Sequence, residues 1–148
     1  MSNHPAVAFQ TTLHVKDHCL CLAAQRAART LARRFDEALK PAGITSGQFS
    51  LLNALNRPEP PTIGSVAGLL AMDRTTLTAN LKPLERRGMI ELVPDEKDKR
   101  SRRIRLGEAG MAVLSLAMPI WLATHGEIDA ALGDAEAMAL RGGLRAVA

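Results

Sequence analysis

The chain has 148 residues, 47% of them hydrophobic and 23% charged, with a net charge of +4, so one compact domain is expected rather than a disordered tail. Aromatic residues make up only 3%, which argues against nucleic-acid binding by stacked bases. The longest mostly apolar run, residues 111–123, is shorter than the roughly 20 residues that span a bilayer. The N-terminal sequence MSNHPAVAFQ does not resemble a secretion signal, and two cysteines do not make a disulfide scaffold, so a cytoplasmic protein is expected.

The first predicted element is an amphipathic helix over residues 17–40. Apolar residues recur along it every three or four positions, as one packed helix face requires. Proline and glycine in Pro41-Ala42-Gly43 should end it. Thr45 stands three residues before Gln48, which is a capping-box pattern and predicts that a second helix begins there.

Two further helices follow a proline-rich loop over residues 56–61. Thr62 is the predicted cap of the first, which is short. Asp73 is the predicted cap of the second, whose buried face carries leucines, with Pro83 inside its last turns and Gly88 at its end. The leucines are Leu77, Leu81 and Leu84.

After Gly88 the hydrophobic period changes from that of a helix to two. Residues 90–93 and 103–106 alternate in this way, and the polar turn between them, residues 94–100, has no residue expected in the core. The pattern predicts a β-hairpin. The C-terminal third returns to helix, over residues 108–132 with a bend near Pro119, and then over residues 134–147 with Asp134 as the cap.

Two short helices followed by a basic hairpin are the order of a winged helix-turn-helix, in a fold that is mainly α with a small β-hairpin (α+β). Residues 73–105 hold ten basic and six acidic residues, whereas residues 106–148 hold two and five, so a polyanionic partner is indicated. The helix after Asp73 exposes polar side chains that suit a DNA major groove, and the hairpin suits the adjacent groove or backbone. The predicted DNA-binding residues are Arg74, Thr75, Thr76, Thr78, Asn80, Lys82, Lys99, Arg100 and Arg102.

Several motifs resemble the MarR family of bacterial transcription regulators. They are Gly43-Ile-Thr-Ser-Gly-Gln-Phe49, Met72-Asp-Arg-Thr-Thr-Leu77, Leu84-Glu-Arg-Arg-Gly-Met-Ile90, Asp95-Glu-Lys-Asp-Lys-Arg100 with Ile104-Arg-Leu106, and Gly110. Two residues depart from the family pattern: Glu96 stands where proline is common, and Gly107 where a threonine cap is common.

The resemblance implies one MarR-like domain over residues 1–148, with a DNA-binding unit at 43–106 and dimerisation helices at 17–41 and 108–148. It implies a homodimer, expected to act as a repressor on a pseudo-palindromic operator in double-stranded DNA. It also implies that Asp98 pairs with a basic neighbour to shape the wing while Arg100 enters the minor groove.

The resemblance further implies release from DNA by a small effector, with an aromatic or phenolic acid as the expected class. Arg26, Arg29 and Phe49 are candidates to hold such an anion, although surface positions for the arginines and a core position for Phe49 remain the alternative. Cys19 and Cys21 are the candidates for a redox-sensing alternative. On a continuous helix their side chains point apart, so an internal disulfide is not expected and buried structural cysteines are the alternative.

Other functions are less well supported by the sequence. His14, His18 and Cys21 would share a helix face if a helix began early, but a fourth ligand is not evident and no metal site or cofactor is predicted. Common catalytic motifs are missing, so an enzyme is not expected. A winged-helix module that binds protein rather than DNA stays as the alternative from another class. The operator, the regulated genes and the effector's identity are not encoded in a recognisable way.

Overall fold

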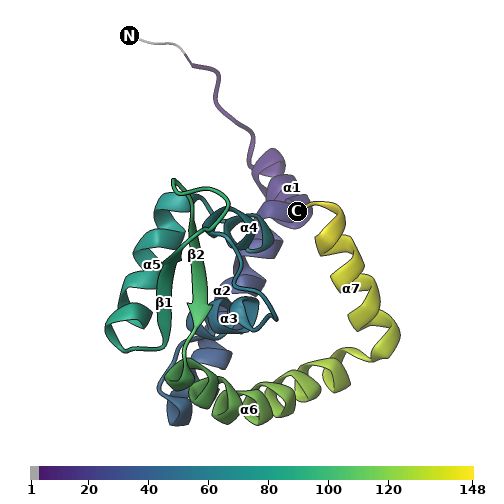
Figure 1. The fold of residues 1–148 in the computed structure, drawn as a ribbon. Coiled ribbons are helices and arrows are strands. Elements are labelled where there is room, and N and C mark those ends of the chain that lie inside the picture. Colours follow the sequence, from purple (N-terminus) through teal and green to yellow (C-terminus); the bar gives the residue numbers. More distant parts are fainter. Residues whose placement is uncertain (1–3) are drawn as a thin grey trace. The chain divides into compact units, whose positions relative to one another are not determined.

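A computed structural model describes residues 4–148 of the chain. It divides into two compact units, one that ends at Arg34 and one that comprises Phe35–Ala148, and each is described by itself. The described residues form helices and a single two-stranded antiparallel sheet, so the fold is mainly α with a β-hairpin, as predicted (Figure 1). The element order within the second unit is that of a winged helix-turn-helix.

The first unit corrects the prediction of one helix over residues 17–40. Helix α1 covers Phe9–His18 and helix α2 covers Leu20–Ala38, so the helical region begins eight residues earlier and is interrupted at Cys19. Cys19 is extended, with φ −75° and ψ 108°. Its Sγ accepts a hydrogen bond from the backbone N–H of Leu22, which satisfies one of the unpaired donors at the start of α2. No proline or glycine marks this break, which is why periodicity missed it.

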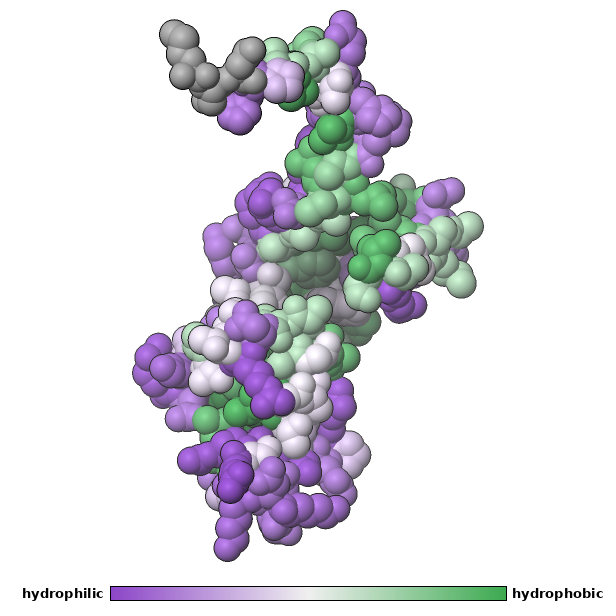
Figure 2. Space-filling model, turned by 90° about the horizontal axis from the view of Figure 1, so that it is seen from above, coloured by the Kyte–Doolittle hydropathy of each residue, from purple (hydrophilic) through white to green (hydrophobic). Residues whose placement is uncertain are grey.

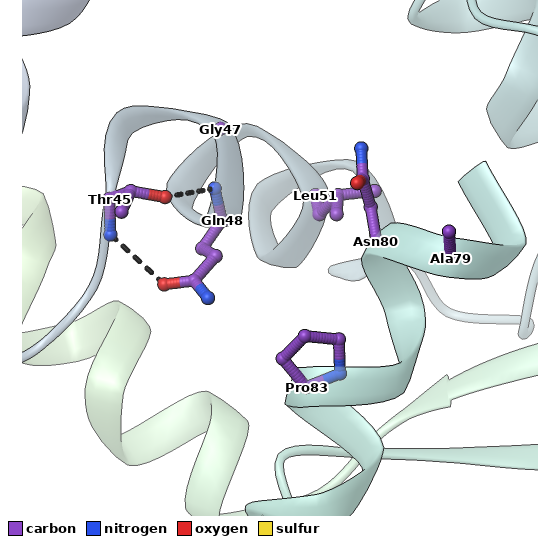
Figure 3. Close-up of a pocket in the computed structure, with 7 residues that line it drawn as sticks. All are labelled: Thr45, Gly47, Gln48, Leu51, Ala79, Asn80 and Pro83. Atoms are coloured by element: carbon purple, nitrogen blue, oxygen red, sulfur yellow. Dashed lines mark hydrogen bonds between the residues drawn. The ribbon is translucent and has the colours of Figure 1, made fainter. Parts of the chain in front are cut away.

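The helix ends and caps at the start of the second unit agree with the sequence. The short 3₁₀ helix η1, Lys40–Ala42, ends at Gly43 with φ 71°, a left-handed conformation that favours glycine. Helix α3, Ser46–Leu55, has the predicted capping box. The Thr45 hydroxyl accepts from the Gln48 N–H at 3.2 Å, and the Thr45 N–H donates to Gln48 Oε1 at 3.0 Å (Figure 3).

The predicted helix-turn-helix is present. Helix α4, Ile63–Leu69, is capped by Thr62, and helix α5, Arg74–Arg86, is capped by Asp73. The turn between them contains Ala71 at φ 50°. Helix α5 continues through Pro83 and buries the three leucines predicted for its inner face, Leu77, Leu81 and Leu84.

The hairpin consists of β1, Ile90–Pro94, and β2, Arg102–Leu106, paired in register Leu92 with Ile104. Ile90 and Ile104 are buried on its inner face. The prediction of a turn without core residues is wrong at one position, because Asp95 is buried with 8% of its surface exposed. A buried carboxylate requires partners from outside its own segment, and the local turn pattern carries no sign of them.

The two C-terminal helices have the predicted bounds. Helix α6 covers Glu108–Leu132 and runs through Pro119, and helix α7 covers Asp134–Ala146. Asp134 is not the cap that was predicted. Gly133, at φ 85°, occupies the cap position, and Asp134 is the first helical residue.

Helix α6 has 25 residues and is long and apolar enough, by length and composition alone, to cross a membrane, which the 13-residue apolar run did not indicate. The core helix of a soluble protein passes the same test, and α6 does contribute to the core. The core of the second unit gathers leucines from α3 and α5, Ile104 from the hairpin, and Leu114 and Ala117 from α6.

Candidate nucleic-acid interface

The outer face of α5 carries the candidate base-reading residues. Successive residues of a helix are 100° apart, so the face opposite the buried leucines is led by Thr75, Ala79, Lys82 and Arg86. All four are exposed. Figure 1 shows α5 beside the hairpin, so that both elements lie within one folded unit. Small side chains at the centre of the face allow a helix to approach a groove closely, and the cations suit phosphates.

The hydroxyl groups of the three threonines are in different states. The Thr76 hydroxyl donates to Asp73 Oδ2 at 2.8 Å, and the Thr78 hydroxyl donates to the Arg74 carbonyl at 2.7 Å. For Thr75 the structure gives no hydroxyl hydrogen bond within residues 4–148. Thr75 is therefore the threonine whose donor and acceptor are both open to a base or phosphate, a distinction that the sequence did not make.

Asp73 fixes the start of this helix. Its carboxylate accepts hydrogen bonds from the Thr76 backbone N–H, at 2.8 Å, and from the Thr76 hydroxyl. These bonds hold the pKa of Asp73 below its ordinary value, the backbone bond being the larger cause. The carboxylate is thus ionised at neutral pH and satisfies a donor at the helix end that would otherwise be unpaired.

Asn80 lies on the flank of α5 rather than at the middle of its outer face. Its Nδ2 is 3.6 Å from the sulfur of Met72, and it lines a pocket of about 230 Å³ between α5 and the start of α3 (Figure 3). The other residues that line the pocket are Thr45, Gly47, Gln48, Leu51, Ala79 and Pro83. Thr45 and Gln48 bond to each other in the capping box, and none of the residues that line the pocket is ionisable, so the pocket adds no charged group to the interface.

The wing residues divide into paired and unpaired cations. Lys99, Arg100 and Arg102 are exposed, and the structure gives them no ion pair within residues 4–148. Arg103 instead pairs with Asp95 at 3.2 Å, and Arg105 pairs with Glu91 at 3.3 Å. Lys97 is likewise exposed and has no ion pair among these residues, so the cations open to a polyanion are Lys97, Lys99 and Arg100 in the turn and Arg102 at the start of β2.

Asp98 has a different contact from the ion pair that the resemblance implies. Its Oδ1 accepts the backbone N–H of Arg100 at 3.0 Å, and its carbonyl accepts the N–H of Ser101 at 2.9 Å. It thus holds the turn from which the Arg100 side chain projects. The ion pair at the root of the wing turn is that of Asp95 with Arg103, neither of which was among the predicted site residues.

Sequence reasoning missed two residues that bear on the candidate interface. Arg86 is exposed and lies four residues after Lys82 on the outer face of α5. The helical spacing from Thr75 was available in the sequence and identifies it. Arg103 was counted only as part of the basic patch, because its buried partner Asp95 cannot be recognised without the fold.

The candidate sensor residues lie in separate units. In the first unit Arg26 and Arg29 are exposed, Cys21 is exposed and Cys19 is half-buried, so the alternative of two buried structural cysteines is not what the chain shows. The Sγ of Cys21 is 3.4 Å from Gln25 Nε2. In the second unit Phe49 is buried and stacks on Trp121, with a ring separation of 5.9 Å.

The break at Cys19 also changes the geometry of the two cysteines. An internal disulfide was not expected on one continuous helix, but Cys19 is not helical, so that restriction does not apply. The histidines His14 and His18 do stack, with ring centroids 4.1 Å apart, while Cys21 belongs to the next helix.

The fold and this face define a DNA-binding winged-helix protein, and comparison with known proteins gives its family. A model of the MarR family matches residues 42–101. The organic hydroperoxide resistance transcriptional regulator of Bacillus subtilis is 31% identical over 108 residues, which are 72% of this chain and 74% of that protein. The chain belongs to the MarR family of transcriptional regulators.

Two other similar proteins bear on function. The transcriptional activatory protein BadR of Rhodopseudomonas palustris is 35% identical over 111 residues, covering 72% of this chain but only 62% of BadR. The structure of the transcriptional regulator MosR of M. tuberculosis in complex with DNA has a TM-score of 0.73 at 36% identity, covering 78% of this chain and 84% of that one. These relatives are regulators of transcription and not enzymes.

Proposed function

We propose that this protein is a cytoplasmic, sequence-specific regulator of transcription that binds double-stranded DNA as a homodimer, without catalytic activity, and represses from a pseudo-palindromic operator. The observation that carries the proposal is the presence, in one folded unit, of a helix with a small polar outer face and a hairpin whose turn region exposes cations that have no ion pair among residues 4–148. The DNA complex of the similar regulator MosR supports a DNA partner. Because BadR is named an activator, the direction of regulation has to be tested separately.

The proposed base reader is tested by a matched pair of substitutions on α5. Thr75→Val removes a hydroxyl without a partner in the described chain, whereas Thr78→Val removes one that is bonded to the Arg74 carbonyl. We expect Thr75→Val to lower discrimination between a selected duplex and a scrambled one by about 1–3 kcal/mol, and Thr78→Val to leave it nearly unchanged. The duplex would be selected from random DNA by the wild-type protein, and affinity measured by fluorescence anisotropy.

The proposed role of the wing is tested by salt dependence. Arg100→Ala should weaken binding to all duplexes and reduce the slope of log K against log salt by about 0.9 for a lost phosphate contact. An unchanged slope would show that the wing does not touch the duplex, and failure of the wild-type protein to bind any duplex would favour the protein-binding module instead.

The homodimer is supported by apolar side chains that the single chain leaves in solvent. Figure 2 shows broad hydrophobic areas at the surface of the molecule. Monomeric soluble proteins rarely expose apolar patches of this kind. In the described part of the second unit the exposed residues include Leu116 and Leu122 on α6, Leu140 and Leu144 on α7, and Val147 directly after α7. Two copies would present two recognition helices to half-sites about one helical turn apart.

An aromatic or phenolic acid is the effector class that we propose, with Arg26, Arg29 and Phe49 as the residues to test. Arg26→Met and Arg29→Met should each weaken the release of DNA by such an acid and leave DNA affinity without the acid unchanged. Release measured against concentration for benzoate, salicylate and a neutral amide analogue checks the need for a carboxylate. Equal release by the neutral analogue would exclude the arginines as the anion site.

Redox sensing is the second candidate, and the exposed Cys21 favours it together with the non-helical Cys19 only two residues away. Two-electron oxidation by an organic hydroperoxide would join the two sulfurs in a disulfide, and the two thiol protons and two electrons would pass to the hydroperoxide, whose O–O bond breaks to give an alcohol and water. The variants Cys19→Ser and Cys21→Ser should both abolish release of DNA by cumene hydroperoxide. Release that persists in the double variant would eliminate this candidate.

A further inference from the structure

The guanidinium group of Arg103 connects the wing to the loop that precedes α4. Its Nε lies 3.2 Å from Asp95 Oδ1, and its Nη1 donates to the carbonyl of Pro60 at 2.7 Å. The side chain is 29% exposed and that of Asp95 is 10% exposed. One arginine near the start of β2 therefore contacts both the root of the wing turn and a segment more than 40 residues earlier.

Both the carboxylate and the backbone of Asp95 make hydrogen bonds within the wing turn. Besides Arg103, its Oδ1 accepts the backbone N–H of Lys97 at 3.1 Å, and its own N–H donates to the Ser101 carbonyl at 3.2 Å. The Lys97 bond, and after it Arg103, hold the pKa of Asp95 below its ordinary value, so the carboxylate is charged at neutral pH. A buried charge is costly unless it is paired, which makes this geometry the favoured one for the turn.

The loop contacted by Arg103 has a restricted backbone and precedes α4, the helix that packs against the recognition helix α5. Pro58, Pro60 and Pro61 restrict its backbone, and the Ile104 N–H donates to the Pro61 carbonyl at 2.9 Å. Thr62, the cap of α4, forms an isolated bridge with Arg103. Helix α4 in turn packs against α5. Continuous contacts thus run from the wing turn to the helix that reads DNA.

We propose that Arg103 and Asp95 are positioning residues for DNA binding: their ion pair, with the bond to Pro60, sets the direction of the wing so that its tip and α5 reach the same duplex together. Arg103 is then not a DNA contact, although it lies among the basic residues of the wing. The inference rests on the proposed function of α5 and the wing. The ion pair would raise DNA affinity by preorganisation, because a wing already held in its binding direction loses less conformational freedom when it binds DNA.

A pair of acid-to-amide substitutions separates positioning from charge. Both Asp95→Asn and Glu91→Gln add one unit of positive charge to the hairpin, and each removes one partner of an arginine. If only the net charge of the hairpin mattered, both variants would bind DNA more tightly than the wild-type protein. We expect Asp95→Asn to bind at least about threefold more weakly, a change typical of residues coupled in one network, and Glu91→Gln to bind as tightly as wild type or tighter.

A double-mutant cycle tests the coupling to the wing tip. In the Arg103→Met background, Arg100→Ala should lose most of its effect on affinity, because a wing that is no longer directed makes little use of its tip. In the control background Arg105→Met, whose partner Glu91 is exposed, Arg100→Ala should keep its full effect. Amide hydrogen exchange of residues 95–101 should quicken in Arg103→Met and not in Arg105→Met, at unchanged overall helix content.

The outcomes distinguish this inference from the proposed function. If Arg100→Ala weakens binding but Asp95→Asn does not, or if Arg103→Met and Arg100→Ala are additive, Arg103 is an ordinary contact or a bystander and the inference is overturned. If neither Arg100→Ala nor Thr75→Val affects binding, the proposed interface itself is wrong. If Arg103→Met does not fold, Arg103→Lys, which keeps the charge and one of the two contacts, takes its place. The effect of Arg100→Ala on affinity must then be smaller in the Arg103→Lys background than in wild type.

Discussion

At the scale of single residues, Gly110 shows how closely the hairpin and α6 approach each other. A Cβ atom at this position would overlap the Met89 carbonyl and lie 2.7 Å from Leu106 Cδ1. At Gly107 the approach is less close: an added Cβ would lie 3.1 Å from the Gly88 carbonyl and 3.3 Å from that of Met89, to which the Gly107 N–H donates at 2.9 Å. A glycine at 107, where the family resemblance led us to expect threonine, therefore leaves room for a tighter contact with the residues before β1.

Gly110→Ala should destabilise the protein by about 1–3 kcal/mol, because the added methyl group meets backbone that cannot move aside. Gly126→Ala is the matched control in the same helix: nothing lies within 4 Å of its added Cβ among the described residues, and alanine favours the helix by about 0.5–1 kcal/mol. Urea unfolding followed by circular dichroism measures both. If α6 did not pack against the residues before β1, Gly110→Ala would stabilise the protein as Gly126→Ala does, and that result would contradict the prediction.

At the scale of elements, one carboxylate joins the two C-terminal helices. Asp129 of α6 pairs with Arg141 of α7 at 2.9 Å and with His125, one turn earlier, at 3.3 Å. His125 also stacks on Trp121 at 4.7 Å between ring centroids. A polar contact next to an aromatic cluster thus joins α7 to α6, and Ala137 of α7 is buried.

This contact predicts a specific pH dependence. The hydrogen bond from Arg141, followed by its charge and that of His125, lowers the pKa of Asp129 from its ordinary value of 3.8. A lowered pKa stabilises the fold fully above 3.8, and the stabilisation is lost as the pH falls from 3.8 through the lower folded value. The stability difference between wild type and Asp129→Asn should shrink as the pH falls below 3.8. Arg141→Met should remove the same pH dependence, and a difference that persists at acid pH would contradict the assignment.

At the scale of the whole molecule, the chain leaves more apolar surface in solvent than a monomer would. Leu140 and Leu144 lie one helical turn apart on α7, and Val147 follows the last residue of the helix; 50%, 46% and 69% of their surfaces are exposed. A second copy of the chain is the partner that we propose for this face. The DNA-binding unit, by contrast, buries its leucines and exposes polar and basic residues.

The double variant Leu140→Lys, Leu144→Lys should shift the protein from dimer to monomer at micromolar concentration, because burying two charges in an apolar interface is costly. Sedimentation velocity measures the change. Leu69→Lys is the control, since Leu69 is 57% exposed but lies on α4 in the DNA-binding unit. A wild-type protein that sediments as a monomer would contradict the homodimer, and with it the pseudo-palindromic operator.

Much of the fold could be predicted from the chain because its signals are local. Caps at Thr45, Thr62 and Asp73 depend on contacts three residues away, and the leucine spacing of α5 marks its buried face. Where the local signal was missing or ambiguous, as at Cys19 and at Asp134 beside Gly133, the helix ends were predicted wrongly.

The sequence by itself determined the class of protein, because helix caps, hydrophobic period and clustered charge are properties of neighbouring residues. Only the tertiary structure decided which cations are free and which are paired. Asp95 is sequence-adjacent to the exposed acids of the turn, yet it is buried against Arg103, whose other contact is the Pro60 carbonyl. Such pairs are made between segments far apart in the chain, and burial, which gives them their energy, exists only once those segments have packed together.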